Sequence, residues 1–274
     1  MRRAARLVAA FALVVASVAT AGAEAPAQAR RIVSANLCAD RLVLALAPRA
    51  HVVSASALAF DRALSTVWHE VEGLRPNRGD AEEILALSPD LVVLGAHAPR
   101  ATEEALRRLG LRVHVVGLAE DLGAAKAEIR SLARALGEGA RGEEMVAALD
   151  ARIAAIPAGA TGRRAAVLLA GGWTAGQGTM ADALLGAVGV QNMAARSGLR
   201  GHGALRLEEL VAADPELLVV EDAGDAGASL SAELLRHPVL RQGRARVLRM
   251  PARLWACPDL ALADAAALVA EAAR

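Results

Sequence analysis

Residues 82–94 have the sequence EEILALSPDLVVL, and residues 208–220 have the sequence EELVAADPELLVV. The two stretches align without a gap. Each begins as a short helix, reaches a Pro that cannot continue the helix, and ends in an apolar run typical of a buried strand. Helix–Pro–strand junctions recur in many α/β proteins, but the shared register and the matching apolar runs favour an internal repeat. We therefore expect two equivalent α/β units.

Around this repeat, short β-like runs alternate with helical patterns along the whole chain. Strands separated by helices of this length indicate parallel βαβ units. The helical pattern is longest between residues 121 and 156, and Pro157 ends it. The sequence thus predicts two α/β lobes with parallel-type sheets, at residues 30–120 and 163–274, joined by a helical connector region at residues 121–157.

Composition sets limits on the function of the protein. The 274 residues include 31 basic and 30 acidic side chains, and 55% of them are hydrophobic. The near balance of charge argues against a nucleic-acid-binding protein. By the usual size of domains, the chain forms one large domain or two lobes of about 120 residues each. Tyr is absent and aromatic residues are scarce, so each Trp is worth considering as a functional residue.

The first residues have the features of an export signal. Arg2, Arg3 and Arg6 precede an apolar run from Leu7 to Ala19, and small residues follow up to Ala23. This run is too short for a stable membrane span. We predict a cleaved signal peptide over residues 1–23, with further small-residue triplets keeping later cleavage points open. The mature protein is expected to be exported to an oxidising compartment without insertion into the membrane.

Common catalytic and metal-binding motifs are missing from the sequence. It contains no G-x-S-x-G, P-loop, H-E-x-x-H or C-x-x-C motif. The six histidines stand singly, so we expect no metal centre built by the protein. The loop Gly176–Thr179 is superficially like a dinucleotide-binding loop. It lacks the third Gly and the later acidic residue of such a loop, and cofactor binding is not predicted there.

Two tryptophans follow predicted strands, at the edge where open α/β sheets bind ligands. Trp173 lies in a loop where Gly172 allows the backbone to turn sharply and Thr174 is the next residue. Trp255 lies in a loop after a later predicted strand. We predict that these four residues bind a ligand, with burial in the core as the alternative for the tryptophans. Trp68 is a further candidate whose loop is harder to place.

Three charged or titratable side chains complete the predicted ligand-binding set. Arg253 and Arg78 could each present a rigid guanidinium to an acidic or chelating ligand. The alternative for both is an arginine on the solvated surface, because the chain has many of them. His202 lies in a glycine-rich stretch and could touch a ligand or the open position of a metal, or could simply be exposed.

Cys38 and Cys257 are the two cysteines of the chain. An even number of cysteines in an exported protein suggests a disulfide. In the chain-entropy model, a bridge across so long a loop would contribute about 4 kcal/mol or more to stability. Both cysteines lie just after predicted strands or their loops and could face one cleft. A pair of free thiols or a metal contact therefore remains open at this point.

From about residue 30 to residue 274, the chain resembles the periplasmic substrate-binding proteins that serve ABC importers of vitamin B12, ferric siderophores and haem. The resemblance rests on IVSANLCAD at 32–40, on residues 82–94, on GGWTAG at 171–176, and on LEEL at 207–210. It implies that a single long helix joins the two lobes and that the ligand is clamped between them. The connector would be residues 142–156, about 22 Å long, and would allow only a small closure of the lobes.

The resemblance also implies how the protein meets its membrane partner. Members of the family dock onto the permease of the importer through one acidic residue on each lobe. The repeat assigns this role to Glu82 and Glu208, which lie eight residues before Asp90 and Glu216. The alternative is that both glutamates only favour the N-termini of their helices electrostatically.

The resemblance further implies a receptor without catalysis, located in the periplasm. It would bind a ferric siderophore, a corrinoid or haem, would hold no intrinsic cofactor, and would act as a monomer on the permease dimer of an ABC importer. The absence of Tyr departs from relatives that line their clefts with Tyr and Trp, so the identity of the ligand is not transferred. A planar macrocycle could stack on the tryptophans, whereas an anionic ferric chelate would favour Arg78 and Arg253.

Two functions from other classes remain open on the sequence alone. An exported enzyme could use the same cleft, although the missing nucleophile and metal motifs count against it. A ligand-binding protein that signals to a membrane sensor would share the fold of a transport receptor. Permease and ATPase genes beside the gene would favour transport.

Overall fold

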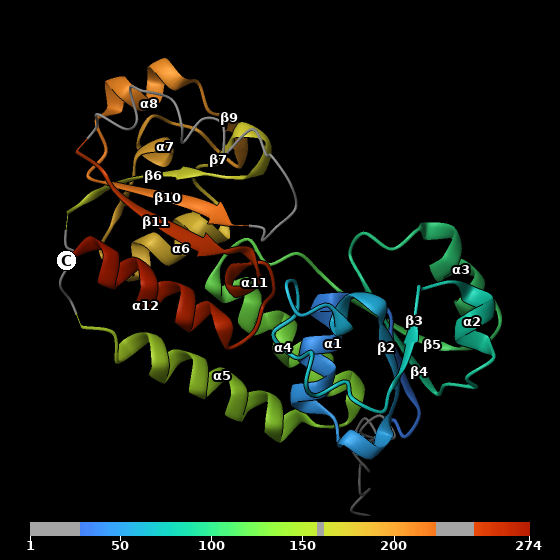
Figure 1. Cartoon of the computed structure of the whole chain (residues 1–274). Coiled ribbons are helices and arrows are strands. Elements are labelled where there is room, and N and C mark those ends of the chain that lie inside the picture. Colours follow the sequence, from blue (N-terminus) through green and yellow to red (C-terminus); the bar gives the residue numbers. More distant parts are fainter. Residues whose placement is uncertain (1–27, 158–161, 223–243) are drawn as a thin grey trace, which may run out of the picture.

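The computed structural model describes residues 28–157, 162–222 and 244–274, and the predicted signal peptide lies outside them. The N-terminal lobe contains a parallel sheet with the strand order β3-β2-β1-β4-β5, shown in blue and teal in Figure 1. The strands are β1 (Ile32–Ser34), β2 (Val52–Ser56), β3 (Arg75–Asn77), β4 (Leu91–Gly95) and β5 (Arg112–Val116). Its helices are α1 (Leu37–Leu46), α2 (Ala81–Leu85) and α3 (Arg100–Arg108), with short 3-10 turns η1 (Arg49–His51) and η2 (Ala57–Phe60).

The C-terminal lobe contains a second parallel sheet, with the order β11-β10-β6-β8. The strands are β6 (Arg164–Leu168), β8 (Gln191–Asn192), β10 (Leu217–Asp222) and β11 (Arg246–Pro251). An antiparallel pair, β7 (Trp173–Ala175) and β9 (His202–Ala204), lies beside this sheet. The helices are α6 (Met180–Ala187), α7 (Met193–Arg196), α8 (Leu207–Ala213), α11 (Ala252–Trp255) and α12 (Ala261–Ala273), with η3 at Ala170–Gly172.

The sheet order shows that the predicted repeat extends over most of each lobe. The strands β2-β1-β4-β5 occupy the same places in the first sheet as β8-β6-β10-β11 in the second. The two copies of the helix–Pro–strand stretch form α2 with β4 and α8 with β10. The predicted α/β fold with two lobes and parallel sheets is confirmed.

Each copy of the repeat makes the same turn between its helix and its strand. Ser88 and Asp214, which are equivalent in the repeat, both have left-handed backbone conformations, with φ of 48° and 43°. Such angles are uncommon for residues other than Gly. They turn the chain at the residue before the Pro, after α2 has ended at Leu85 and α8 at Ala213. The strand that follows can then enter the sheet directly.

An arginine at the start of an inner strand of each sheet holds this turn in place: Arg31 directly precedes β1, and Arg164 is the first residue of β6. In the first lobe, Arg31 donates from its side chain to the carbonyls of Leu87 and Ser88, at 2.6 and 2.9 Å. The carboxylate of Asp90 accepts the backbone N–H of Arg31 at 3.1 Å.

In the second lobe the equivalent residues repeat this arrangement. The backbone N–H of Arg164 donates to Glu216 at 3.1 Å, and the guanidinium of Arg164 reaches the carbonyl of Ala213 at 3.5 Å. These bonds fix the register of the inner strand against its neighbour, and so they fix where each strand ends.

Alternating side chains on the strands pack against two layers of helices. Ile32, Leu91 and Val93 belong to a core shared with α1 and α4, whereas Val33, Val92 and Leu94 pack with Ile84 of α2 and Leu106 of α3. The second sheet divides its side chains in the same way between α6 with α12 and α8. The inner layers of the two lobes form one continuous core, so the lobes are joined by packing as well as by the chain.

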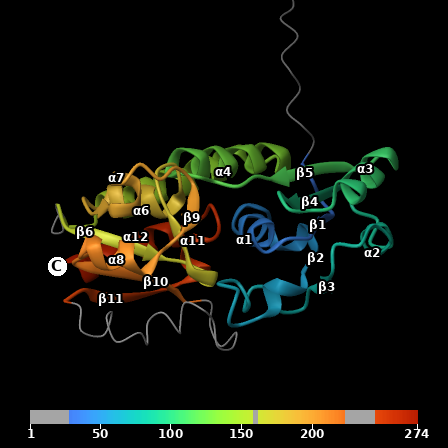
Figure 2. The same cartoon turned by 90° about the horizontal axis from the view of Figure 1, so that it is seen from above.

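Two antiparallel helices connect the lobes (Figure 1), and Figure 2 shows the first of them, α4, from above. They are α4 (Leu122–Leu136) and α5 (Gly139–Ala154), separated by Gly137, which has a left-handed backbone with φ of 80°. Arg141 of α5 donates to the carbonyl of Ala45 in α1 at 3.0 Å, and Arg152 forms an ion pair with Asp264 of α12. The α5 helix therefore spans both lobes.

This connector differs in two respects from the predicted helix at residues 142–156. It begins at Gly139, and Gly142 lies inside it. A Cβ at Gly142 would lie 2.4 Å from the Cβ of Ala133 in α4, so Gly there allows the two helices to approach closely. In addition, α4 runs along α5, with ion pairs such as Arg130–Glu143 between them. Among the described helices, none has the length and apolar character needed to cross a bilayer.

Candidate ligand-binding cleft

A cavity of about 490 Å³ lies between the two lobes. Its walls come from the carboxyl ends of strands in both parallel sheets, where open α/β sheets bind ligands. The N-terminal lobe contributes Asn36 after β1, His97 after β4, and residues 116–120 at the end of β5. The C-terminal lobe contributes Leu169 after β6, Glu221 in β10, and the corner that follows β11. The volume falls in the range of sites for small molecules and cofactors.

Close packing around Asn36 shapes the N-terminal wall. Its side chain caps α1 by accepting the backbone N–H groups of Cys38 and Ala39. A Cβ at Gly95 would lie 2.4 Å from the side chain of Asn36. The Gly at the end of β4 therefore leaves room for the cap, and the chain continues to His97 along the cavity.

Trp255 lines the cavity from the C-terminal lobe. It lies in the short helix α11 rather than in a loop, because Pro251 starts a helical turn directly after β11. Its side chain is 9% exposed, and its Nε1–H donates to Glu221 at 3.2 Å. Trp255 is thus both a core residue and a part of the cavity wall.

Trp173 and its predicted partners Gly172 and Thr174 are not among the residues that line this cavity. Trp173 is the first residue of β7 and is 50% exposed. Thr174 points to the opposite side of the strand, into a second cavity of about 760 Å³ within the C-terminal lobe. Gly172 has a φ of 78° and accepts the backbone N–H of Leu205 at 2.9 Å, so its role is in the turn before β7.

The predicted ligand-binding residues Arg78, Arg253 and Trp68 also lie outside the cavity lining. The side chains of Arg78 and Arg253 are exposed. Trp68 is half-buried, and the guanidinium of Arg62 lies 3.9 Å from the centre of its ring, a cation–π contact. In the part of the chain that the structure describes, the lining contains no Arg or Lys.

His202 does line the cavity, as predicted for a ligand contact, and it is exposed there. His97 lines the same cavity from the other lobe and was not predicted. Its signal in the sequence is its place two residues after the apolar strand β4, at the ligand-binding edge of the sheet. Asn36 and Glu221 were missed as well. Over the described residues, no group of three or more His, Cys, Asp or Glu side chains could hold a metal ion.

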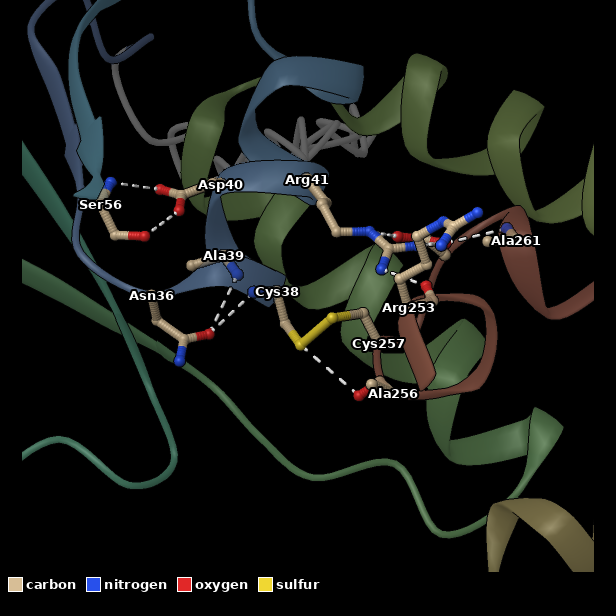
Figure 3. Close-up of a disulfide and its surroundings, with 11 residues drawn as sticks. Asn36, Cys38, Ala39, Asp40, Arg41, Ser56, Arg253, Ala256, Cys257 and Ala261 are labelled. Atoms are coloured by element: carbon tan, nitrogen blue, oxygen red, sulfur yellow. Dashed lines mark hydrogen bonds and ion pairs between the residues drawn. A yellow bond between two sulfur atoms is a disulfide. The ribbon is translucent and has the colours of Figure 1, made fainter. Parts of the chain in front are cut away.

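A junction of two bonds joins the lobes beside the cavity (Figure 3). The predicted disulfide is present: Cys38 of α1 is bonded to Cys257, which follows α11, with their Cα atoms 5.1 Å apart. One turn further along α1, Arg41 forms a buried ion pair with Asp259, in which Nη2 donates to Oδ1 at 2.8 Å. Arg41 also donates from Nη1 to the carbonyl of Arg253 at 2.6 Å. Two side chains of α1, Cys38 and Arg41, are therefore fixed to the corner between α11 and α12.

Glu82 and Glu208 occupy equivalent places on the two lobes. Both are exposed in the first turn of their helices, α2 and α8. The two helices lie on different lobes, well apart, in Figure 1. The structure thus leaves both carboxylates accessible to a partner.

Two lobes with a cavity between the carboxyl ends of their parallel sheets define a ligand-binding protein. A family model described as periplasmic binding protein matches residues 32–246, and the chain belongs to this family. The resemblance seen in the sequence is therefore confirmed. Membership implies a periplasmic location.

Solved structures of similar proteins support the same conclusion. The periplasmic haem-binding protein RhuT from Roseiflexus sp. RS-1 is 27% identical, with a TM-score of 0.73 over 89% of this chain and 99% of that chain. A periplasmic haem-binding protein from Pseudomonas aeruginosa is 24% identical (TM-score 0.66; 89% and 92% covered), and the vitamin B12-binding protein BtuF of Vibrio cholerae is 19% identical (TM-score 0.64; 89% and 96% covered). These two show the fold alone. No curated protein matches the sequence significantly.

The buried carboxyl of Asp40, next to the junction, generates a prediction about pH. Burial raises the pKa of Asp40 above its ordinary value of 3.8, against the hydrogen bonds from Ser56 that favour the carboxylate. Because the folded state holds this proton more tightly than the unfolded state, Asp40 contributes stability at low pH and loses it as the pH rises through its folded pKa. Each unit of elevation is worth about 1.4 kcal/mol.

We expect the Asp40→Asn variant to gain stability relative to the wild type as the pH rises from 3 to 7. Urea unfolding at several pH values measures the difference in the free energy of unfolding. Asp80→Asn, at an exposed position before α2, reports the effect of the same substitution without burial. Parallel stability curves for wild type and Asp40→Asn would contradict this account of the buried carboxyl.

Proposed function

We propose that this protein is a periplasmic receptor that binds a metal chelate between its lobes and delivers it to an ABC importer. The observation that supports this most strongly is the cavity itself, because both lobes contribute walls to it at the carboxyl ends of their sheets. The family consists of binding proteins, and the receptor has no need of an intrinsic cofactor or of catalysis.

Among metal chelates, the lining favours a metal-containing tetrapyrrole, either haem or a corrinoid. The similar proteins whose structures are known include haem-binding and vitamin B12-binding proteins. Aliphatic side chains and the ring of Trp255 offer apolar surface to a macrocycle. The arginines that an anionic ferric siderophore would favour, Arg78 and Arg253, lie outside the described lining.

Two histidines are suited to hold the metal of such a ligand. Imidazole nitrogen is a common ligand for iron and other first-row transition metals. His97 and His202 reach the cavity from different lobes. A macrocycle between them would therefore find a nitrogen donor on either side, and each lobe would contribute to its affinity.

We further propose that a monomer delivers the ligand, with Glu82 and Glu208 contacting the permease dimer of the importer. The support for this is the equivalent, exposed position of the two carboxylates in the repeat. Export would depend on residues 1–23, which we propose are removed as a signal peptide.

Titration with haemin and with aquocobalamin, whose axial water an imidazole can replace, tests the ligand and the site together. We expect saturable quenching of tryptophan fluorescence by one of them, because Trp255 lines the cavity. His97→Ala and His202→Ala should each weaken that binding by at least tenfold. His51→Ala is the matched control, since His51 directly precedes β2 at the opposite edge of the sheet, and it should leave the affinity unchanged. Equal binding by all four proteins would exclude this cavity as the site.

Charge reversal tests the proposed docking surface. Glu82→Arg combined with Glu208→Arg should abolish uptake of the ligand by cells, while binding by the purified protein stays within twofold of the wild type. Glu144→Arg combined with Glu271→Arg changes the charge equally at exposed sites on α5 and α12. Uptake that survives the first pair of changes would contradict the docking role of the two carboxylates.

A further inference from the structure

The disulfide is part of the wall of the ligand cavity. Cys38 and Cys257 both line it, although they come from different lobes and lie 219 positions apart in the sequence. Cys38 is half-buried, whereas Cys257 is 2% exposed. A ligand in the cavity would therefore lie against the bridge, and a small reagent that enters the cavity would reach the sulfur of Cys38.

The bridge also positions the C-terminal wall. Cys257 lies two residues after Trp255, and Pro258 between Cys257 and Asp259 lines the cavity as well. Through the disulfide, this corner is bonded to the first turn of α1 in the other lobe. The width of the cavity between Asn36 and Trp255 thus depends on a covalent bond.

Other contacts would keep the lobes together if the bridge were opened. The buried ion pair between Arg41 and Asp259 crosses the same junction one turn away. The α5 helix is bonded separately to α1 through Arg141 and to α12 through Arg152. Loss of the disulfide would therefore loosen the cavity wall without separating the lobes.

From this arrangement we infer that the Cys38–Cys257 disulfide is a redox element coupled to ligand binding. The oxidised protein holds the cavity in its high-affinity form, and reduction of the disulfide lowers the affinity for the ligand. This inference rests on the proposed function of the cavity. The reductant would be a dithiol. One of its thiolates attacks a sulfur of the bridge, its second thiolate resolves the mixed disulfide, and two electrons and two protons pass to Cys38 and Cys257 as the dithiol becomes a disulfide.

Coupling between two equilibria is reciprocal. If reduction raises the dissociation constant of the ligand by a given factor, bound ligand must lower the equilibrium constant for reduction of the disulfide by the same factor. A tenfold change in affinity corresponds to a shift of about 30 mV in the reduction potential of this two-electron couple. A ligand that merely covers the sulfur would slow reduction and leave the potential unchanged.

A redox titration of the wild-type protein, purified from the periplasm of an expression host, tests this. The protein is equilibrated with mixtures of reduced and oxidised dithiothreitol, with and without saturating probe. The probes are cyanocobalamin and gallium protoporphyrin IX, because thiols do not reduce the metal of either compound. We expect the bound probe to lower the reduction potential by about 30 mV or more, and the dissociation constant of the fully reduced protein to rise at least tenfold. An unchanged potential would overturn the inference.

The Cys38→Ser/Cys257→Ser variant provides a second measurement. It should bind the probe at least tenfold more weakly than the oxidised wild type, and binding within twofold would overturn the inference. If neither probe binds the wild type, the proposed ligand class fails, and hydrogen exchange still tests the bridge without a ligand. Residues 36–39 and 252–258 should then exchange faster in the reduced protein, whereas equal exchange would overturn the role of the disulfide in the cavity wall.

Discussion

The contact between α1 and the corner after β11 determines the form of the cleft. Two sheets that end at facing edges do not by themselves make a binding site, because their separation must also be fixed. Here the disulfide between Cys38 and Cys257 and the ion pair between Arg41 and Asp259 fix it at adjacent turns of one helix. In the chain-entropy model, a bridge between residues so far apart contributes about 5 kcal/mol to stability. The same bond therefore stabilises the fold and sets the distance between the cavity walls.

The ion pair contributes in a different way. Arg41 is 2% exposed, and burial raises the pKa of Asp259 while Arg41 opposes that shift. The free energy needed to remove two charges from water offsets much of their electrostatic attraction. The buried pair therefore adds little net stability. Its value lies in geometry, because a planar guanidinium satisfies Asp259 and the carbonyl of Arg253 only in one relative position of the lobes. Replacing one partner would leave the other charge buried without compensation.

The architecture could be predicted from the sequence because it depends on local patterns. The repeat at 82–94 and 208–220 was visible as a shared register of Pro and apolar residues, and it corresponds to matching helices and strands in the two lobes. The disulfide could be predicted because the sequence has an export signal and an even number of cysteines. The pairing of Arg31 with Asp90, and of Arg164 with Glu216, was not predicted, because it depends on which strand lies inside each sheet.

The side chains of the cavity were harder to predict than the edge of the sheet on which it lies. A position after a strand identifies that edge but not the direction of each side chain. Thr174 therefore faces a second cavity, and Arg78 and Arg253 face solvent. His202 and Trp255 line the cleft as proposed ligand contacts. The equally placed His97 was not predicted, because it stands singly in the sequence without a second metal-ligating residue nearby.

The central proposal is tested most directly by anomalous X-ray diffraction from crystals of the protein in complex with haemin or aquocobalamin, measured at the absorption edge of iron or cobalt. In aquocobalamin a histidine nitrogen can replace the axial water on cobalt. One metal peak is expected between the lobes, within bonding distance of a nitrogen of His97 or His202. A metal peak in the second cavity of the C-terminal lobe, or on the outer surface of either lobe, would contradict it.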